Sequence, residues 1–494
     1  MTLPQPEGNF KPKFSLLKKN EFIIGLLALI VYVSCLLNDF HTDDWIVLSI
    51  LRDGFSFHDF LSMENAGRFR PLTNVLLYIR YLVFGDNAHL YYLLNIVLHA
   101  AVSISFYRLL KRIGMPEKAA LLSAIFFAVY FQHYEGVIWL YGTIRLFAAL
   151  FYIASLWQLY DYLRTGGRKA LVLFAIFSGL GLFVVEDFVV APVIFAGFVL
   201  LFADKGDMRG KLISVALVGL SGLVIYFILR SILIDRPGIT ENYYYLGWHI
   251  FRTLFDYLGW MIIPSPSHPY FAKLSSSLGP IYYIWKAVFI AAAACFIPAS
   301  VWIYIKTPRQ IRFFLLFIFI TLLPIIPLNY KVTSRNIYLP SIGLSAVGGY
   351  LIYRLLWNRA LKVISKVVIA ALVTLYFAVN IAAIDIATAE YRETQNLVKG
   401  IINDMADSGL DFRSIHLVLL DHLPGRTIVG PAMIYRLHYK GSVIASNDPI
   451  NGPIDIHHAA DSLYNEGVPF YLFDYRDGKM VEAKGDYLRN DTIR

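Results

Sequence analysis

Long apolar runs recur through the first three quarters of the chain. A helix needs about 20 mainly apolar residues to cross the hydrocarbon of a bilayer. The shorter apolar segment 73–85 contains Arg80 and predicts a helix that lies at the membrane surface. The longer runs predict a polytopic α-helical membrane protein with about eleven membrane-spanning helices, at residues 22–38, 89–110, 119–134, 143–162, 170–186, 188–203, 212–232, 281–305, 313–329, 338–356 and 364–385.

The basic residues between these runs predict the orientation of the chain. Every second connection is short and rich in Lys and Arg, and these connections with the N-terminal tail hold nearly half of the 44 basic residues. Cytoplasmic loops carry such an excess. We therefore expect residues 1–21 to be a cytoplasmic tail and the first loop, 39–88, to lie on the extracytoplasmic side. An odd number of crossings also puts the C-terminus there.

After about residue 386 the pattern changes to that of a small soluble domain. The stretch "AEYRETQNLVKGIINDMADSG" predicts an amphipathic helix. Shorter segments then predict alternating strands and helices: "SIHLVLL", "GPAMIYRLHY", "SVIAS", "IDIHHAADSLYNEG" and a hairpin in "PFYLFDYRDGKMVEA" around Asp477-Gly478. We expect a transmembrane domain over 22–385 and an extracytoplasmic α/β domain over 386–494.

Composition agrees with the membrane class and excludes others. The chain of 494 residues is 57% hydrophobic and only 16% charged, whereas soluble domains carry about 25% charged residues. The net charge of +9 comes largely from the basic connections, so it does not indicate nucleic-acid binding. Cys35 and Cys295 both lie in apolar runs, which indicates neither a disulfide framework nor a metal site.

The first loop opens with an unusual group of ionisable residues. The stretch "LLNDFHTDDWIVL" places Asp39, His41, Asp43 and Asp44 directly after the first apolar run. One interpretation is that they are interfacial residues that end a helix. The other is that they are carboxylates held at the membrane surface for chemistry, because ionisable groups near the bilayer are costly and often functional.

The second predicted span carries a polar stripe. Tyr92, Asn95 and His99 are spaced i, i+3, i+7, and Ser103 follows four residues later, so the four share one helix face. The stripe predicts either hydrogen bonds between helices or the inner wall of a substrate site.

Further charged residues fall in connections on the same predicted side. Lys331 and Arg335 have no acidic neighbour in the sequence, and an arginine fork suits a phosphate. The stretches are "GRFRPLTN" with Arg68 and Arg70, "FQHYEGVIWLYGTIR" with His133, Glu135 and Arg145, "LFVVEDFVVAP" with Glu186 and Asp187, and "NYKVTSRNIYLPSIG" with Lys331, Arg335 and Tyr338.

Sugar transfer from a polyprenyl phosphate would use such groups. A cation must stabilise the charge on the departing phosphate, and a carboxylate must take the proton of the incoming hydroxyl. Two alternatives stay open. A transporter or flippase of a polyprenyl-linked glycan should have paired broken helices and internal repeats, which the sequence does not show. An inactive accessory subunit would recruit a partner through the C-terminal domain.

The motifs together resemble the GT-C superfamily of membrane glycosyltransferases, and in particular its protein O-mannosyltransferase branch. In order along residues 20–360 they are "DDW", "FRPL", "LLNIVLHA", "HYEGVIW", "VVEDFVVAP" and "SRNIYLPSIG". The resemblance implies an inverting transfer from a polyprenyl-phosphate-linked sugar to a hydroxyl of a protein, lipid or glycan. Asn336 stands where that branch has an aromatic residue, and the TPR repeats of some members are replaced by the α/β domain.

The resemblance implies roles for individual residues. A first-loop Asp acts as the base, and Arg335 is the basic partner. In an extended backbone Asp43 and Asp44 would face opposite ways, so we expect one to be the base, Asp43 by its place in the pair, and the other an orienter. The predicted set is: catalytic, Asp43 and Asp44; donor phosphate, Arg335, Lys331 and Arg70; substrate, Tyr92, Asn95, His99, Glu135, Glu186, Asp187 and Tyr338.

Neither a cofactor nor a metal site is assigned from the sequence. Asp43, Asp44, Glu186 and Asp187 could bind a divalent cation. We expect the protein to lie in the cytoplasmic (inner) membrane of a bacterium, or in the endoplasmic reticulum membrane of a eukaryote.

Overall fold

The computed structural model describes most of the chain. Within the described ranges, the side chains of Thr42, Asp43 and Asp53 are left out. The described residues are 18–53, 69–234, 246–265, 274, 277–328, 332–423, 429–446, 454–465 and 468–483.

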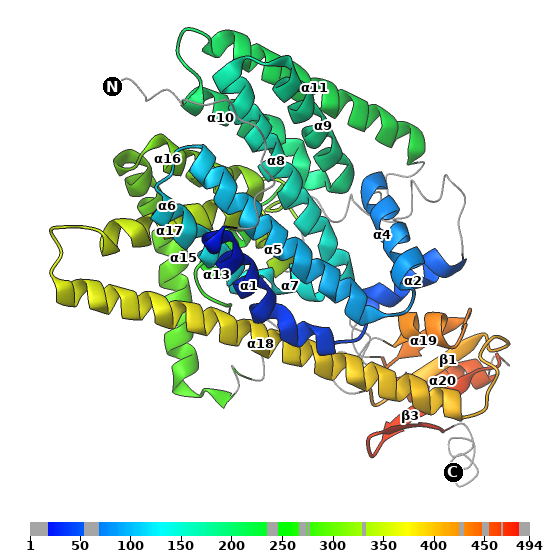
Figure 1. The fold of residues 1–494 in the computed structure, drawn as a ribbon. Coiled ribbons are helices and arrows are strands. Elements are labelled where there is room, and N and C mark those ends of the chain that lie inside the picture. Colours follow the sequence, from blue (N-terminus) through cyan, green and yellow to red (C-terminus); the bar gives the residue numbers. More distant parts are fainter. Residues whose placement is uncertain are drawn as a thin grey trace.

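A large helical body makes up residues 19–407, and Figure 1 shows its helices packed side by side around α5 and α8. Several helices begin with Pro in their first turn, where no backbone N–H is needed. The helices of the body are α1 (Lys19–Tyr32), α2 (Thr42–Asp53), α4 (Pro71–Phe84), α5 (Ala88–Arg112), α6 (Glu117–Ala128), α7 (Tyr134–Ile138), α8 (Thr143–Thr165), α9 (Arg168–Val184), α10 (Ala191–Phe202), α11 (Met208–Leu233), α13 (His249–Trp260), α15 (Pro280–Lys306), α16 (Arg309–Leu322), α17 (Pro340–Leu356) and α18 (Val363–Asp407).

Short 3-10 helices connect several of these helices. They are η1 (Val33–Leu37), η2 (Phe131–His133), η3 (Leu140–Gly142), η4 (Glu186–Val190) and η6 (Ser334–Ile337). Two of them, η4 and η6, carry residues of the site described below.

Six described helical segments are long and apolar enough to cross a membrane, and the pair α6 and Phe131–Ile138, bent by 51°, would make a seventh. Helices α9, α10, α16 and α17 coincide with the remaining predicted spans but have 12 to 17 residues. The chain is a multi-pass membrane protein, and the number of eleven crossings stays a prediction.

The helices approach closely where small residues meet. A Cβ on Gly349 of α17 would lie 2.3 Å from the backbone nitrogen of Ser123 in α6, and one on Gly343 would lie 2.4 Å from the carbonyl oxygen of Phe314 in α16. Small residues allow such contacts between membrane helices, where van der Waals packing replaces the hydrophobic effect. Helix α17 is thereby fixed between α6 and α16, and this fixes the start of α17, where η6 joins it.

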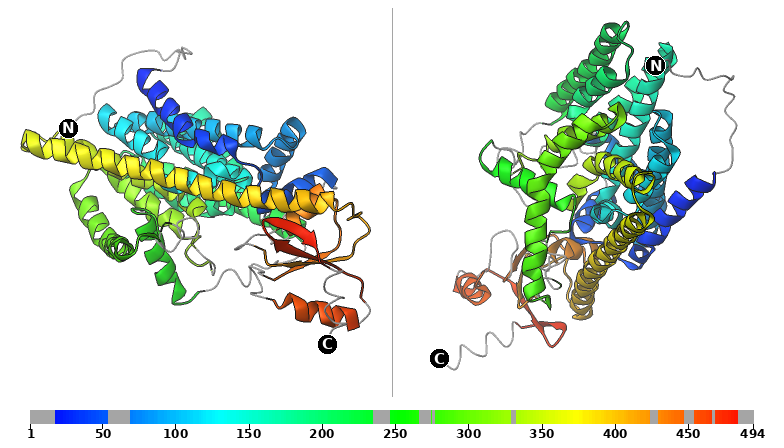
Figure 2. Two further views of the ribbon diagram at one scale, coloured as in Figure 1. Left: turned by 90° about the horizontal axis from the view of Figure 1, so that it is seen from below. Right: turned by 90° about the vertical axis from the view of Figure 1, so that its left-hand side faces the viewer.

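Helix α18 is one continuous helix of 45 residues. It runs along the whole body to the C-terminal strands, as the left view in Figure 2 shows. The predicted boundary at residue 386 therefore falls inside a helix, because the apolar run and the amphipathic helix after it share one unbroken backbone. The body and the C-terminal region are joined by this helix and not by a loop.

One helix was not predicted from the sequence. It lies between residues 233 and 280, where the hydrophobic pattern indicates a loop. Helix α13 (His249–Trp260) is strongly amphipathic and buries Tyr257 and Trp260 against the body. It packs on α15.

The C-terminal region is a four-stranded sheet in the order β2-β1-β3-β4, with β1 parallel to β2 and to β3 and with β3 antiparallel to β4. Asp477 and Gly478 in the β3–β4 turn both have positive φ, +51° and +83°, as a type I′ hairpin requires. The strands and helices coincide with the predicted ones: β1 (Leu417–Asp421), α19 (Gly430–Arg436), β2 (Ser442–Ala445), α20 (Ile456–Asn465), β3 (Tyr471–Arg476) and β4 (Lys479–Glu482).

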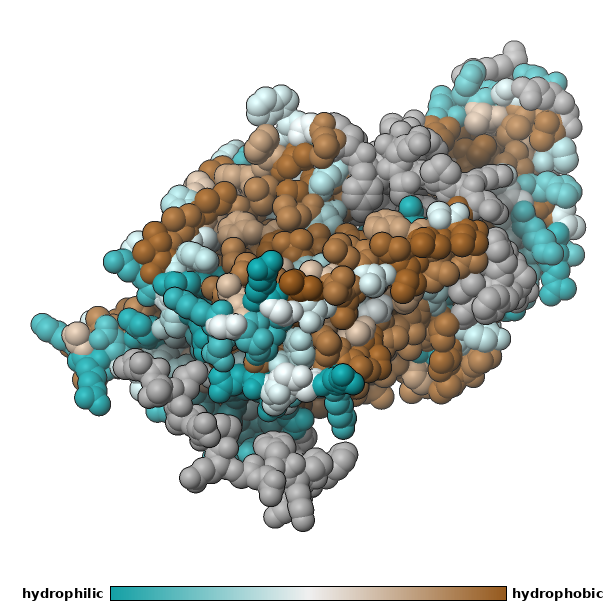
Figure 3. All heavy atoms as spheres, turned by 90° about the horizontal axis from the view of Figure 1, so that it is seen from above, coloured by the Kyte–Doolittle hydropathy of each residue, from teal (hydrophilic) through white to brown (hydrophobic). Residues whose placement is uncertain are grey.

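The surface agrees with a membrane environment for the body. Figure 3 shows one face on which hydrophobic residues form a broad band over the helices and hydrophilic residues gather toward its ends. Large apolar side chains such as Leu217, Val224 and Ile290 are about half exposed or more. In water such a surface would be an aggregation hazard. In a bilayer it is the surface that is expected to face the lipid chains.

Candidate functional site

Two arginine–carboxylate pairs meet at η4, in the sharp turn between α9 and α10. The Nε of Arg70, at the start of α4, donates to Glu186 Oε2 at 2.5 Å. The guanidinium of Arg145 in α8 pairs with Asp187. The Arg145 and Asp187 side chains are only 12% and 11% exposed. The predicted carboxylates of "VVEDFVVAP" are therefore already neutralised by arginines from two other helices.

A third contact joins Glu135 to the start of η6. Glu135 Oε2 accepts the backbone N–H of Arg335 at 2.9 Å. Gly142 allows the chain to pack closely against α7, since a Cβ at residue 142 would lie 2.5 Å from the carbonyl oxygens of Glu135 and Gly136. The segment η2–α7–η3 thus folds back on itself and holds Glu135 toward η6.

Asn336 links these contacts into one network. Its side-chain oxygen accepts from Arg145 Nη2 at 2.7 Å, and its Nδ2 donates to the hydroxyl of Tyr257 in α13 at 2.9 Å. Because Asn336 and Arg335 are neighbours, and Asp187 and Glu186 are neighbours, the contacts form one continuous group. We call it the arginine–carboxylate cluster: Arg70, Glu135, Arg145, Glu186, Asp187, Arg335 and Asn336.

Arg335 differs from the other two arginines of the cluster. Its guanidinium lies over the ring of Trp139, with 4.5 Å from Cζ to the ring centroid. Among the residues that the structure describes, it forms neither an ion pair nor a side-chain hydrogen bond, whereas Arg70 and Arg145 each hold a carboxylate. Arg335 is half-buried. A cation held against an aromatic face in this way can still accept an anionic ligand.

The acidic pair of the first loop lies at the start of α2. Asp44 is fully buried, and its Oδ2 accepts the N–H of His41 at 2.9 Å. His41 precedes the helix and Asp44 is its third residue, so this is the carboxylate half of a capping box. The backbone is helical and not extended, which corrects the premise that the two side chains face opposite ways. The side chain of Asp43 lies outside the described residues.

The polar stripe of α5 is buried and hydrogen-bonded to other segments. The Tyr92 hydroxyl donates to the Asp39 carbonyl at 2.7 Å, and Asn95 Nδ2 donates to the carbonyls of Val137 and Trp139 at 3.0 Å. His99 Nε2 contacts the Ala128 carbonyl at 3.1 Å and its Nδ1 contacts the Tyr338 hydroxyl at 2.8 Å.

These contacts also fix the tautomer of His99. A carbonyl oxygen only accepts, so Nε2 carries the proton and Nδ1 accepts from Tyr338. The residues of the stripe thus form hydrogen bonds between segments, as the first of the two interpretations of the stripe expects. It supports the turns on which Glu135 and Arg335 stand.

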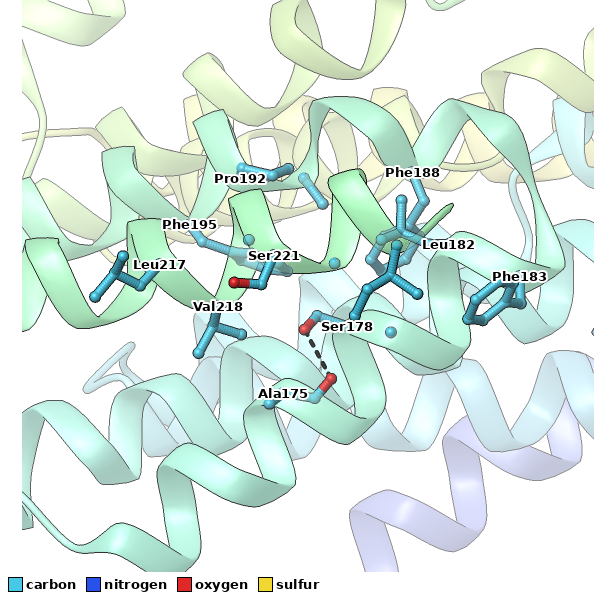
Figure 4. A pocket seen from close by; sticks show the side chains of 15 residues that line it. Ala175, Ser178, Leu182, Phe183, Phe188, Pro192, Phe195, Leu217, Val218 and Ser221 are labelled. Carbon is cyan, nitrogen blue, oxygen red and sulfur yellow. Dashed lines mark hydrogen bonds between the residues drawn. The ribbon is translucent and has the colours of Figure 1, made fainter. Parts of the chain in front are cut away.

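A mainly apolar cavity of about 410 Å³ lies beside η4, between α9, α10 and α11. Figure 4 shows Leu182, Phe188, Phe195 and Leu217 around it, with the hydroxyls of Ser178 and Ser221 as polar groups. Ser178 is satisfied by the Ala175 carbonyl at 3.1 Å. Phe188 and Glu186 both lie on η4, so this short helix contributes to the cavity and to the arginine–carboxylate cluster.

Other predicted residues fall outside this network or outside the described chain. Lys331 and Arg68 lie among residues that the structure leaves out. No group of three His, Cys, Asp or Glu that could hold a metal ion is found in the described ranges.

The sequence analysis missed the roles of Asn336 and Tyr257 and gave none to Arg145. The sequence did offer one indication for Asn336, since a polar residue stands there where the O-mannosyltransferase branch has an aromatic one.

A second charged cluster stands at the carboxyl ends of β1 and β3. Asp421 and Asp474 are paired in register and nearly buried. His422 Nδ1 lies 2.9 Å from Asp474 Oδ1, and His457 Nε2 lies 3.3 Å from Asp421 Oδ2. The hydrogen bond to Asp474 and the charge of Asp421 raise the pKa of His422. We call Asp421, His422, His457, Asp474 and Arg476 the aspartate–histidine cluster.

Comparison with known proteins begins with sequence. No protein-family model matches the chain. Over 87 residues it is 31% identical to protein O-mannosyl-transferase TMTC3 of Homo sapiens, a match that covers 18% of this chain and 9% of that protein. Over 154 residues it is 27% identical to protein O-mannosyl-transferase F38B6.6 of Caenorhabditis elegans, which covers 28% and 22%. The matches thus span less than a quarter of either relative, and they confirm the resemblance to this branch.

Comparison of structures extends over nearly the whole chain. The oligosaccharyltransferase AglB of Archaeoglobus fulgidus, solved with an inhibitory peptide and a dolichol-phosphate, aligns with 92% of this chain and 69% of that chain. The TM-score is 0.52 at 11% identity. The chain has the GT-C membrane fold. At this identity the likeness establishes the fold alone.

Proposed function

We propose that this chain is an inverting glycosyltransferase that moves a sugar from a polyprenyl-phosphate-linked donor to a hydroxyl acceptor. The observation that carries the proposal is Arg335, a half-buried cation without a carboxylate partner among the described residues, set in a network where the other arginines are paired. Of the three arginines in the cluster, Arg70 and Arg145 each hold a carboxylate, whereas Glu135 accepts only the backbone N–H of Arg335. The Arg335 guanidinium, held over Trp139, is therefore the one whose donors can bind an anion. In the GT-C fold a lipid phosphate is the anion that this arrangement would accept.

The cavity beside η4 suits the lipid part of such a donor. Its lining is almost entirely apolar, and it lies between helices whose outer faces are exposed apolar residues such as Leu217 and Ile225. An isoprenoid chain could reach it from the bilayer while the phosphate stays near the arginines. AglB, which has the same fold, was solved with a dolichol-phosphate, and this supports the same class of donor here.

The reaction is a single displacement. Asp43 takes the proton of the acceptor hydroxyl, the hydroxyl oxygen attacks the anomeric carbon, and the bond from that carbon to the phosphate oxygen breaks. The electron pair leaves with the phosphate, whose charge Arg335 stabilises. Attack opposite the leaving group inverts the configuration. Asp44 positions Asp43 by capping α2, and Glu135 positions Arg335 through its backbone.

The acceptor and the membrane orientation belong to this proposal. The match to O-mannosyltransferases favours mannose as the sugar and a protein as the acceptor. Lipid and glycan acceptors are included in the experiment described below. The basic connections favour a cytoplasmic N-terminal tail and an extracytoplasmic C-terminal region. In a bacterium that membrane would be the inner one, and in a eukaryote that of the endoplasmic reticulum.

The proposal is tested with the full chain reconstituted in liposomes. It is incubated with synthetic polyprenyl-phosphate mannose, with other polyprenyl-phosphate sugars, and with peptide, lipid and glycan acceptors, and products are detected by mass spectrometry. We expect transfer with one donor and an anomeric configuration opposite to that of the donor. Movement of intact lipid-linked sugar across the bilayer without any transfer would instead identify a transporter.

A further inference from the structure

Helix α2, which carries the acidic pair, is covered by helix α19 of the C-terminal region, and Figure 1 shows the two side by side. The rings of Trp45 and Tyr435 lie 5.4 Å apart. Arg436 lies over the Trp45 ring at 5.3 Å, and Arg52 lies over the Tyr435 ring at 4.9 Å. Arg52 Nη1 also donates to the Tyr435 carbonyl at 2.6 Å. Aromatic and cation–π contacts of this kind each contribute stabilisation.

Tyr435 also contacts the membrane body directly. Its hydroxyl donates to Asp86 in the turn between α4 and α5. The residue is 5% exposed, and burial together with the Asp86 carboxylate raises the pKa of its phenol well above the usual value. The phenol therefore stays a neutral donor throughout the physiological range. One side chain thus connects α19, α2 and the α4–α5 turn.

The segment before α2 is held by the extracytoplasmic part of α18. His41 stacks on Tyr391 with ring centroids 4.2 Å apart. The Asp39 N–H donates to Gln395 Oε1 at 2.9 Å, and Lys399 Nζ lies 3.3 Å from Asp39 Oδ2. Residues on both sides of the acidic pair are therefore in contact with the last quarter of the chain.

We propose that the C-terminal region positions the catalytic helix, with Tyr435 as the positioning residue that fixes α2 against the body. This inference rests on the proposed function, because it assigns to the region a role in setting the geometry of the base and not only in binding the acceptor. The region and α2 then act as one unit, so that displacement of α19 displaces the start of α2, the helix that includes Asp43. A shift of about 1 Å in a catalytic group can lower a rate by about a hundredfold.

The test compares three variants of the full chain in liposomes. Tyr435→Ala removes the ring and the hydroxyl, and Tyr435→Phe keeps the ring and removes only the hydroxyl, which bonds Asp86. Tyr464→Ala is the matched control, because Tyr464 lies on α20 of the same region and is 62% exposed. For each variant kcat and the KM values of donor and acceptor are measured. Hydrogen–deuterium exchange of residues 42–53 is measured on the same samples.

We expect Tyr435→Ala to lower kcat by about tenfold to a hundredfold, with both KM values within about twofold of wild type. Exchange in residues 42–53 should become at least about tenfold faster. Tyr435→Phe should lie between wild type and the Ala variant in both measurements, and Tyr464→Ala should match wild type.

A raised acceptor KM with unchanged kcat in Tyr435→Ala would overturn the inference and leave the region as an acceptor-binding module. Unchanged exchange in α2 would overturn it as well. If the wild-type chain transfers no sugar, the proposed function fails, and the exchange data alone then decide whether Tyr435 holds α2.

Discussion

The two charged clusters of the molecule differ in how far their charged side chains are exposed to solvent. In the arginine–carboxylate cluster the paired residues are 42 to 200 positions apart in sequence, and the Arg145 and Asp187 side chains are almost buried. In the aspartate–histidine cluster the two aspartates are buried, but their partners His422 and His457 are 64% and 60% exposed.

The difference is one of desolvation. Buried charges must be paired because each unpaired ion costs several kcal/mol, and the pairs then hold distant helices in one geometry. Exposed pairs are screened by water and contribute about 1 kcal/mol or less. We therefore expect substitutions in the first cluster to change the fold and the reaction, and substitutions of the exposed histidines in the second to change little beyond a dependence on pH.

The largest effect should come from breaking the Arg145–Asp187 pair. Arg145→Ala leaves a nearly buried carboxylate without its cation, a change that costs about 3–5 kcal/mol. Thermal unfolding of the full chain in detergent should show a marked loss of stability.

The control is Arg164→Ala, which removes an exposed arginine from the same helix and should leave stability unchanged. The double variant Arg145→Ala/Asp187→Ala should recover part of the loss. Equal stability of wild type and Arg145→Ala would mean that the pair is solvated, as in the second cluster.

Arg335→Ala should act on the reaction and not on stability. It removes a charge-assisted contact to the departing phosphate, which is worth on the order of 3 kcal/mol or about a hundredfold in kcat. Arg335→Lys should recover only part of this, because the planar fork and its stacking on Trp139 are lost. Normal turnover of Arg335→Ala at saturating donor would assign the phosphate to another cation. The next candidates are Arg70 and Arg230, which lies in the last turn of α11.

Asp44 should behave as a capping residue. Asp44→Ala removes the acceptor for the His41 N–H and should cost about 1 kcal/mol of stability, whereas Asp44→Asn keeps an acceptor oxygen and should cost less. Thermal unfolding of both variants measures the difference. A large loss of turnover in Asp44→Asn at unchanged stability would give this carboxylate a chemical role instead.

The smallest effect should be a pH dependence of the stability of the aspartate–histidine cluster. The folded-state pKa of His422 lies above its ordinary value of 6.5, so its stabilisation is fully present below that value and is lost as pH rises through the folded-state pKa. Hydrogen exchange of β1 and β3 should therefore become slightly faster from about pH 6 to about pH 9, and less so in His422→Gln. The same pH dependence in both proteins would remove His422 from the explanation.

Local patterns predicted much of the fold. Apolar runs located the helices of the body, and period-2 segments with a turn at Asp477-Gly478 located the strands. The continuity of α18 through residue 386 could not be read in this way, because a change from an apolar to an amphipathic face looks like a boundary although the backbone hydrogen bonds continue. Helix α13 was missed because its 12 amphipathic residues are too few to cross a membrane and so are not predicted as a span.

The site was predicted as a set of residues and not as a set of contacts. The topology predicted from the sequence puts Glu135, Glu186, Asp187 and Arg335 on one side of the membrane. It could not show that Arg145 neutralises Asp187 or that Arg335 stands over Trp139, since such pairs depend on how distant helices pack. It also did not indicate that Asp44 caps a helix, because the turn before α2 has no distinctive spacing.

The central claim is that the first-loop carboxylate Asp43 is the base for sugar transfer from a polyprenyl phosphate. The most direct measurement is the single-turnover rate of Asp43→Asn with saturating donor and acceptor, beside Asp407→Asn as a control for the loss of an exposed carboxylate in α18. Because Asn keeps the shape and removes the basicity, the rate should fall by about 10²–10⁴-fold while polyprenyl-phosphate binding and protein level persist. A rate equal to that of wild type would show that the acidic pair only begins a helix.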